Sequence, residues 1–170
     1  MAAPSICAFV AGPIEIWVDT GASRAAEFLG WSANGVQIEE IGFHSPVVSD
    51  ENGGDQGVPV DYQFFGRQHR VTCELSKLQK LVLGKVEQRY NAANIGAGEA
   101  SVGMLLGCLD VTYRLLLKST TGNFIRNYLA AVALDPIERS PVGSQYTRAR
   151  VSFTCNPVAG VLFNTTDISD

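Results

Sequence analysis

The sequence predicts a mainly β protein, either a β-sandwich or a small antiparallel barrel, with one inserted α-helix near residues 77–90. Three observations predict this fold class. Apolar and polar residues alternate over several segments of strand length, glycine, proline and asparagine separate those segments, and only one segment has apolar residues at helical spacing. The 170 residues, of which 46% are hydrophobic and 18% are charged, suit a single domain spanning residues 1–170 with a real core.

The first strands are expected within residues 6–19 and 36–48. An Asn-Gly turn signal precedes the second of these segments, and Pro46 limits how centrally the end of that strand can pair. Residues 20–34 have a mixed pattern that predicts no strand. The apolar phase of the first segment consists of Ile14, Ile16 and Val18.

Residues 57–75 predict a β-hairpin whose two arms support each other. If Gly66 and Arg67 are the central turn residues, Gly66 supplies the positive φ of a type II′ turn and Phe64 faces His69. The same register pairs Tyr62 with Val71, Val60 with Cys73, Gln63 with Arg70, and Asp61 with Thr72.

This register sorts the hairpin into two faces. The polar face consists of Asp61, Gln63, Arg70, Thr72 and Glu74. The apolar face, which we expect to pack on the core against the helix, consists of Val60, Tyr62, Phe64, Val71 and Cys73.

The loop that leads into this hairpin, near residues 49–57, is polar and contains three glycines and three acidic residues. We expect a long, flexible, solvated loop. The alternative is a flap that becomes ordered against a neighbouring subunit. Calcium binding is not expected, because the D-x-D-x-D-G spacing with a later glutamate is absent.

The helix is predicted over residues 77–90. Ser76 fits an N-cap, with Gln79 positioned to complete a capping box. A connection rich in glycine, alanine and asparagine follows over residues 91–103. The apolar residues at helical spacing are Leu78, Leu81, Val82, Val86 and Tyr90.

The second half returns to strands. Residues 109–118 and 124–134 alternate and are joined by a loop containing Gly122, so they predict a second hairpin. Residues 146–155 supply a further strand with clean alternation, and residues 158–163 follow an Asn-Pro turn. The result is seven or eight antiparallel strands and one helix.

The sequence lacks the motifs of an enzyme. It contains no G-x-S-x-G, P-loop, strand-linked G-x-G-x-x-G or H-E-x-x-H motif. The two histidines are His44, beside a Ser-Pro, and His69, which the hairpin register places against Phe64. We therefore expect no catalytic residues, no cofactor and no metal.

The cysteines are widely separated and include no C-x-x-C pair, which argues against a metal site. Cys73 and Cys155 fall on the apolar phase of predicted strands and are expected to be reduced core thiols. The N-terminus lacks a basic segment, and no stretch has the roughly 20 apolar residues that a membrane helix needs. A cytoplasmic product is expected.

The formal net charge of -4 argues against a free-standing nucleic-acid binder. Arg148 and Arg150 share a face of one strand and would form a basic stripe with Arg114 and Arg70 if their strands were adjacent. Three interpretations stay open: ordinary solvent-facing charge, an intersubunit salt-bridge surface, or a nucleic-acid contact.

The order of motifs over residues 36–90 resembles tail tube proteins and related tail or neck virion proteins of tailed bacteriophages. The features that carry the resemblance are a G-x-P-V-D opening after an acidic Gly-rich loop, an aromatic arm with Phe-Gly, a return arm V-T-C-E-L, and then a helix. The second half is compatible in order but has no specific matching motif.

The resemblance implies a structural virion protein, made in the host bacterial cytoplasm, that assembles with itself into rings. Such rings, expected to be hexameric, would stack into a tail tube through which genome DNA passes without being held. Asp61, Gln63, Arg70, Thr72, Glu74 and Asp110 would then be the candidate subunit-interface or lumen-facing residues, and Asp61, Glu74 and Asp110 would repel phosphates. The alternatives are a tail terminator, neck or capsid decoration protein and, from a different class, a small-molecule-binding β-barrel.

Overall fold

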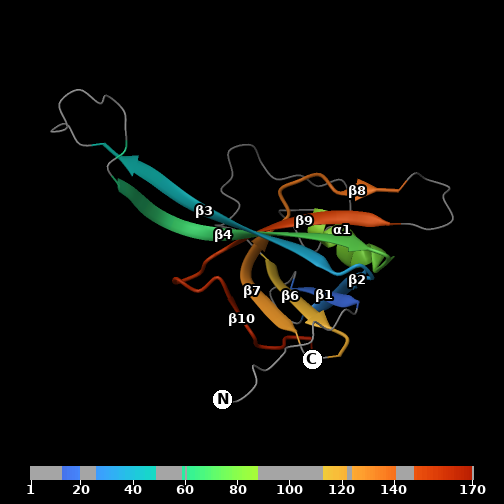
Figure 1. Cartoon of the computed structure of the whole chain (residues 1–170). Coiled ribbons are helices and arrows are strands. Elements are labelled where there is room, and N and C mark those ends of the chain that lie inside the picture. Colours follow the sequence, from blue (N-terminus) through green and yellow to red (C-terminus); the bar gives the residue numbers. More distant parts are fainter. Residues whose placement is uncertain are drawn as a thin grey trace, which may run out of the picture.

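The computed structural model describes residues 13–19, 26–48, 59, 61–87, 113–121, 124–140 and 148–169. In this part of the chain one antiparallel sheet runs in the order β3-β4-β9-β7-β6-β1-β2-β5, with β10 paired to β7 and β8 paired to β9 (Figure 1). The prediction of a mainly β fold with one helix is confirmed. The elements are β1 (Ile14–Asp19), β2 (Glu27–Ser32), β3 (Val36–Val47), β4 (Asp61–Leu75), β5 (Lys77–Leu78), α1 (Lys80–Glu87), β6 (Tyr113–Ser119), β7 (Ile125–Val132), β8 (Glu138–Arg139), β9 (Ala149–Asn156) and β10 (Phe163–Asn164).

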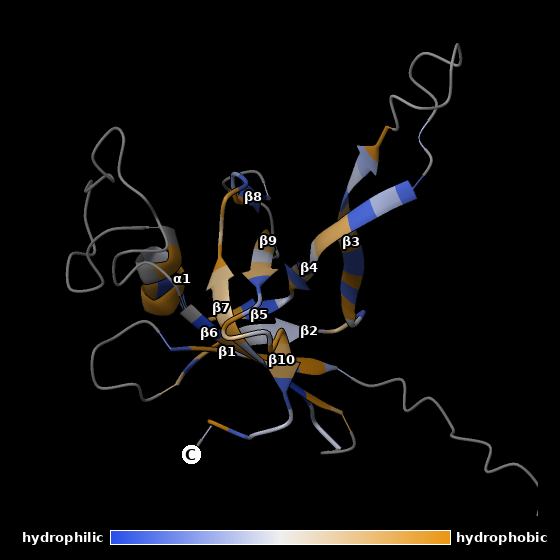
Figure 2. Ribbon diagram, turned by 90° about the vertical axis from the view of Figure 1, so that its left-hand side faces the viewer, coloured by the Kyte–Doolittle hydropathy of each residue, from blue (hydrophilic) through white to orange (hydrophobic). Residues whose placement is uncertain are grey.

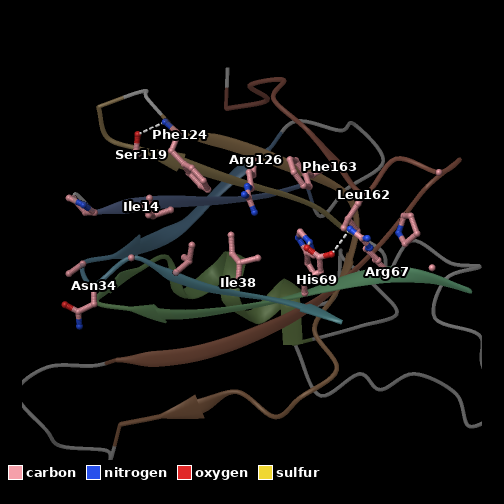
Figure 3. A pocket seen from close by; sticks show the side chains of 18 of the residues that line it. Ile14, Asn34, Ile38, Arg67, His69, Ser119, Phe124, Arg126, Leu162 and Phe163 are labelled. Atoms are coloured by element: carbon pink, nitrogen blue, oxygen red, sulfur yellow. Dashed lines mark hydrogen bonds and ion pairs between the residues drawn. The ribbon is translucent and has the colours of Figure 1, made fainter. Parts of the chain in front are cut away.

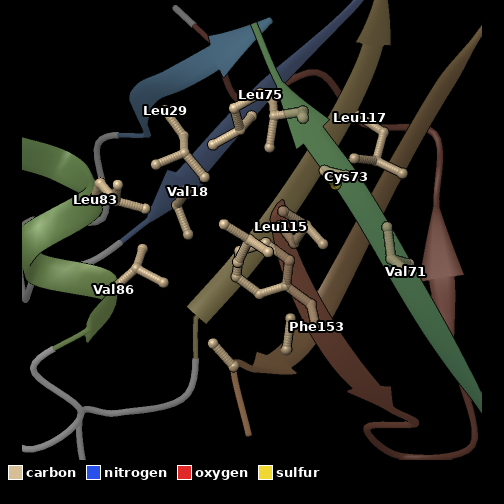
Figure 4. Close-up of a cluster of buried hydrophobic side chains, with 14 of the residues drawn as sticks. Val18, Leu29, Val71, Cys73, Leu75, Leu83, Val86, Leu115, Leu117 and Phe153 are labelled. Carbon is tan, nitrogen blue, oxygen red and sulfur yellow. The ribbon is translucent and has the colours of Figure 1, made fainter. Parts of the chain in front are cut away.

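The sheet curls around a core, so that β4 and β9 face β1 and β6 across buried side chains (Figure 4). The alternation along each strand sends one set of side chains inward. Helix α1 packs against one end of this core, where Leu83 and Val86 point toward Val18 and Leu29. The fully buried large side chains include Ile16, Leu29, Leu75, Leu115, Leu117, Tyr128 and Phe153.

Most of the predicted strands are confirmed. The apolar phase of the first strand, Ile14, Ile16 and Val18, is buried. The predicted second hairpin is formed by β6 and β7, and the strand predicted over residues 146–155 is β9. Cys73 and Cys155 are buried free thiols, as expected. Residues 6–12, 49–57 and 91–103 lie outside the described residues.

The prediction of one hairpin over residues 57–75 is wrong. Residues 61–75 are a single strand, β4, which pairs along its length with β3. Gly66 does have a positive φ, of 136°, but it lies opposite Phe43 while His44 lies opposite Phe64. Phe65 is therefore an extra residue in a β-bulge, and the bulge, not a turn, produces the change of phase in the alternation.

The helix is shorter than predicted, and its start differs. Lys77 and Leu78 pair with β2 as β5, and the Ser76 hydroxyl donates to the Trp31 carbonyl at 3.2 Å. The first helical bond runs from the Leu83 amide to the Gln79 carbonyl at 3.0 Å. Ser76 is therefore not the N-cap, because the residues that follow it continue the sheet.

Two further differences concern apolar residues. Leu81, predicted on the inner face of the helix, is 59% exposed, whereas Val82 and Val86 are buried. Strand β2 was not predicted, because its sequence EFLGWS does not alternate. The β1–β2 register shifts between Ile16 and Trp17, and that irregularity is consistent with the broken pattern.

No helix among the described residues is long and apolar enough to cross a membrane.

Candidate assembly surface

The distal parts of β3 and β4 form a two-stranded arm that leaves the body of the protein (Figure 1). In the described part of the chain, β4 pairs with β9 only from His69 to Leu75, whereas its pairing with β3 continues outward to Asp61. We call residues 41–48 and 61–68 the arm. A two-stranded ribbon without a third strand or a packed layer is at best marginally stable in water.

Large apolar side chains are exposed on the arm. Tyr62, Phe64 and Phe65 are 63%, 52% and 63% exposed. Phe43, Val47 and Val48 are also among the exposed large hydrophobic residues. Figure 2 shows apolar segments on both strands of the arm. The expectation that Tyr62 and Phe64 pack on the core is therefore wrong, although Val71 and Cys73 on the same predicted face are buried. Val60 lies outside the described residues.

Both faces of the arm carry these side chains. Phe64 lies opposite His44, with ring centroids 5.3 Å apart, and Arg67 lies over the Phe64 ring at 5.5 Å. Phe43 and Val47 belong to the alternate phase of β3 and so point to the other face. Apolar residues on both faces of a protruding ribbon are typical of a surface that another protein covers.

Three of the predicted site residues lie together on the outward face of β4 and β9. Arg70 forms an ion pair with Asp135, and Thr72 shares a hydrogen bond with Ser152 at 3.2 Å. Glu74 accepts a hydrogen bond from Arg148 at 2.9 Å. We call this surface the polar face.

The other three predicted site residues lie elsewhere or cannot be placed. Asp61 and Gln63 are exposed on the arm, and the Asp61 carboxylate accepts a hydrogen bond from the Tyr62 amide at 2.7 Å. Asp110 lies outside the described residues. The polar face and the arm therefore share one strand, but they are not one cluster.

The proposed basic stripe is only partly formed. Arg70, Arg148 and Arg150 do lie on β4 and β9 or directly beside them, and Arg150 pairs with Glu138 at 3.7 Å. Arg114 lies on β6, where it forms an ion pair with the buried Asp19 at 2.8 Å. Its inclusion in the stripe is wrong, because β6 and β9 are separated by β7 in the sheet.

A cavity of about 1550 Å³ opens between the inner face of β3 and β4 and the ends of β1, β7 and β10 (Figure 3). Its apolar lining includes Ile14, Val36, Ile38, Phe124, Leu162 and Phe163. Its polar lining includes Glu40, Arg67, His69 and Arg126. Sequence reasoning missed this site, because its residues come from strands whose contact depends on the curl of the sheet.

His69 is a buried polar residue of this cavity. Its Nδ1 shares a hydrogen bond with the Tyr128 hydroxyl at 3.0 Å, and its ring lies 5.8 Å from that of Phe163. Burial lowers the pKa of His69, against the opposing effect of the nearby Glu40 carboxylate. The expected contact with Phe64 is wrong, because Phe64 lies beyond the bulge and faces His44. His69 is thus a neutral, hydrogen-bonded residue of the cavity wall.

Among the described residues, no group of three or more histidine, cysteine, aspartate or glutamate side chains is arranged to hold a metal ion.

No family model matches the chain, and no curated protein matches it. Two solved structures are similar to it. One is a chain from the virion of a native gene transfer agent (GTA) particle, with 8% identity and a TM-score of 0.48, covering 89% of this chain and 95% of that chain. The other is a chain from the tail of an empty GTA particle, computed with helical refinement and C6 symmetry, with 11% identity and a TM-score of 0.49, covering 91% of this chain and 96% of that chain.

Proposed function

We propose that this chain is a structural protein of a phage-type tail, which assembles with itself into rings that stack as a tube. The observation that carries the proposal is the protruding arm with large apolar side chains on both faces. A monomer would leave this surface in water, whereas a neighbouring copy would bury it. The role is structural and involves no catalysis.

Ring closure follows from the kind of contact that an arm makes. An arm on one copy that packs on a different surface of the next copy makes a head-to-tail contact, and such contacts close into a ring or continue as a filament. Six copies per ring is the number that the resemblance to tail tube proteins implies. The open edge of β3 would also be covered in such an assembly.

The polar face would form the wall along which DNA passes. Its arginines are paired: Arg70 with Asp135, Arg148 with Glu74, and Arg150 with Glu138. A guanidinium that already has a carboxylate partner contributes less to the counterion release that drives binding to phosphate. The expected repulsion between Glu74 and the DNA phosphates is weaker for the same reason, because Glu74 is paired with Arg148. The surface would therefore let DNA slide past without binding it.

Size-exclusion chromatography with negative-stain imaging of the purified chain tests the proposal. Tubes or stacked rings are the expected result. The proposed location of the assembled tube is the virion. Single rings that do not stack would favour the tail terminator or neck role. A chain that stays monomeric up to high concentration would refute self-assembly.

The cavity lined by Ile38 and Phe163 is the observation that favours the second candidate, a small-molecule-binding barrel. Its volume of about 1550 Å³ exceeds the roughly 300–1,000 Å³ of typical small-ligand pockets. A monomer that bound an apolar ligand in this cavity would support that candidate against the structural role.

A further inference from the structure

Arg126 is placed in the cavity in an arrangement that leaves its charge available. Its guanidinium lies 4.7 Å from the centre of the Phe163 ring and 5.4 Å from that of Phe124. It also interacts with the Tyr128 hydroxyl. Among the residues that the structure describes, no carboxylate forms an ion pair with Arg126, whereas Arg67 in the same cavity is paired with Glu40 at 2.9 Å.

This arrangement selects a carboxylate. Two aromatic rings hold the guanidinium plane and shield it partly from water, which strengthens its attraction for an anion. A planar guanidinium also donates two parallel hydrogen bonds to a carboxylate. The apolar side chains around it, such as Ile38 and Leu162, favour an occupant that carries apolar groups next to its acidic ones.

The size and position of the cavity favour a segment of polypeptide chain as its occupant. The volume of about 1550 Å³ is larger than most small ligands need. One wall is β3, the first strand in the sheet order, which pairs with β4 alone in the described part of the chain. An extended segment can therefore add its backbone to the edge of β3 while its side chains enter the cavity.

We infer that the occupant is the tip of the arm, residues 47–62, of a second copy of this chain. This inference rests on the proposed self-assembly and names the surface that receives the arm. The tip carries the exposed apolar residues Val47, Val48 and Tyr62. Its acidic residues include Asp50, Glu51 and Asp55, and one of these three carboxylates is the proposed partner of Arg126.

The proposed contact joins the arm of one copy to the cavity of another. In its described part the arm runs outward from the body (Figure 1), and Phe64 and Phe65, in the middle of its β4 strand, line one side of the cavity. The contact is thus between two different surfaces of two copies, which is the type that closes rings or extends filaments.

A charge exchange between the two surfaces tests the inference. Arg126→Glu is expected to weaken self-association at least about tenfold in sedimentation velocity, since like charges would meet in a partly desolvated contact. The tip variant Asp50→Lys/Glu51→Lys/Asp55→Lys is expected to weaken it similarly. The chain that carries all four substitutions is expected to regain association. Lys80→Glu, an exposed residue on α1, makes the same change of charge outside the cavity and is the control.

Folding is checked separately. Arg126→Gln removes the charge and keeps most of the length, and thermal unfolding of each variant shows whether the loss of stacking on Phe163 alters the monomer. The inference would be overturned if Arg126→Glu associated as strongly as the wild type. It would also be overturned if the tip substitutions did not restore the association that Arg126→Glu had lost. In both cases a wild-type chain that still forms rings would leave the proposed function standing, and a wild-type monomer would refute both.

Discussion

Replacing Tyr62, Phe64 and Phe65 together with serine is expected to abolish association without unfolding the protein. Complete burial of a large apolar side chain contributes about 1.5–3 kcal/mol relative to exposure. These three side chains are 63%, 52% and 63% exposed in the monomer. An interface that covered them would therefore gain about 1–2 kcal/mol from each, or about 3–5 kcal/mol together, after subtraction of the part already buried.

That free energy corresponds to a change of about 100- to 3,000-fold in a dissociation constant. Sedimentation velocity over a concentration series measures this change. Far-UV circular dichroism and the thermal midpoint are expected to stay close to those of the wild type, because none of the three residues belongs to the buried core cluster.

The control is Leu81→Ser, which removes a side chain that is 59% exposed on α1, outside the arm and the cavity. It is expected to associate like the wild type. The reasoning would be refuted if the arm variant associated normally, or if the control lost association to the same extent.

Three further predictions concern the monomer. Gly30→Ala is expected to lower the free energy of unfolding, measured in urea titrations, by about 1–3 kcal/mol. The reason is that a Cβ at this position would collide with the Lys77 carbonyl oxygen. An unchanged free energy of unfolding would contradict the observed β2–β5 pairing. Hydrogen bonds from Lys118 and Ser169 lower the pKa of Asp167 to about 2, below the ordinary value of 3.8. The ionised Asp167 carboxylate therefore contributes to stability above about pH 4, and this contribution is lost as the pH falls to about 2. The thermal midpoints of wild type and Asp167→Asn should therefore differ at neutral pH and converge at pH 2, and a difference independent of pH would contradict this. Burial raises the pKa of the Cys73 thiol to about 12, so peptide mapping should find it unmodified by iodoacetamide at pH 8 in the folded protein, and labelling as fast as in urea would show that the site opens.

The strands could be predicted where one face is buried. Ile14, Ile16 and Val18 alternate with polar residues because β1 packs its inner face on the core. Strand β2 could not be found in this way, because its pairing with β1 contains an irregularity and its residues do not keep a period of two.

Gly66 shows why the central register was misread. A glycine with positive φ fits both a type II′ turn and a bulge, and each would reverse the phase of the alternation around it. What decides between them is pairing with distant strands. β4 lies between β3 and β9, and residues 57–75 alone contain no information about either partner.

The candidate site was predictable only in its residue types. Arg70, Thr72 and Glu74 were expected on a polar face of one strand, and they lie there. Their ion-pair partners, however, are 65 and 74 positions away in the chain for Arg70 and Glu74. Arg126 was not identified, because an arginine next to an aromatic residue is common on exposed strands and only the curl of the sheet brings Phe163 beside it.

An electron cryo-microscopy reconstruction of the assembled particle tests self-assembly through the arm most directly. The account predicts that Phe64 and Phe65 of each copy are buried against a neighbouring copy. A particle that closes through other surfaces and leaves both rings in solvent would contradict it, and so would a chain that forms no particle at any concentration.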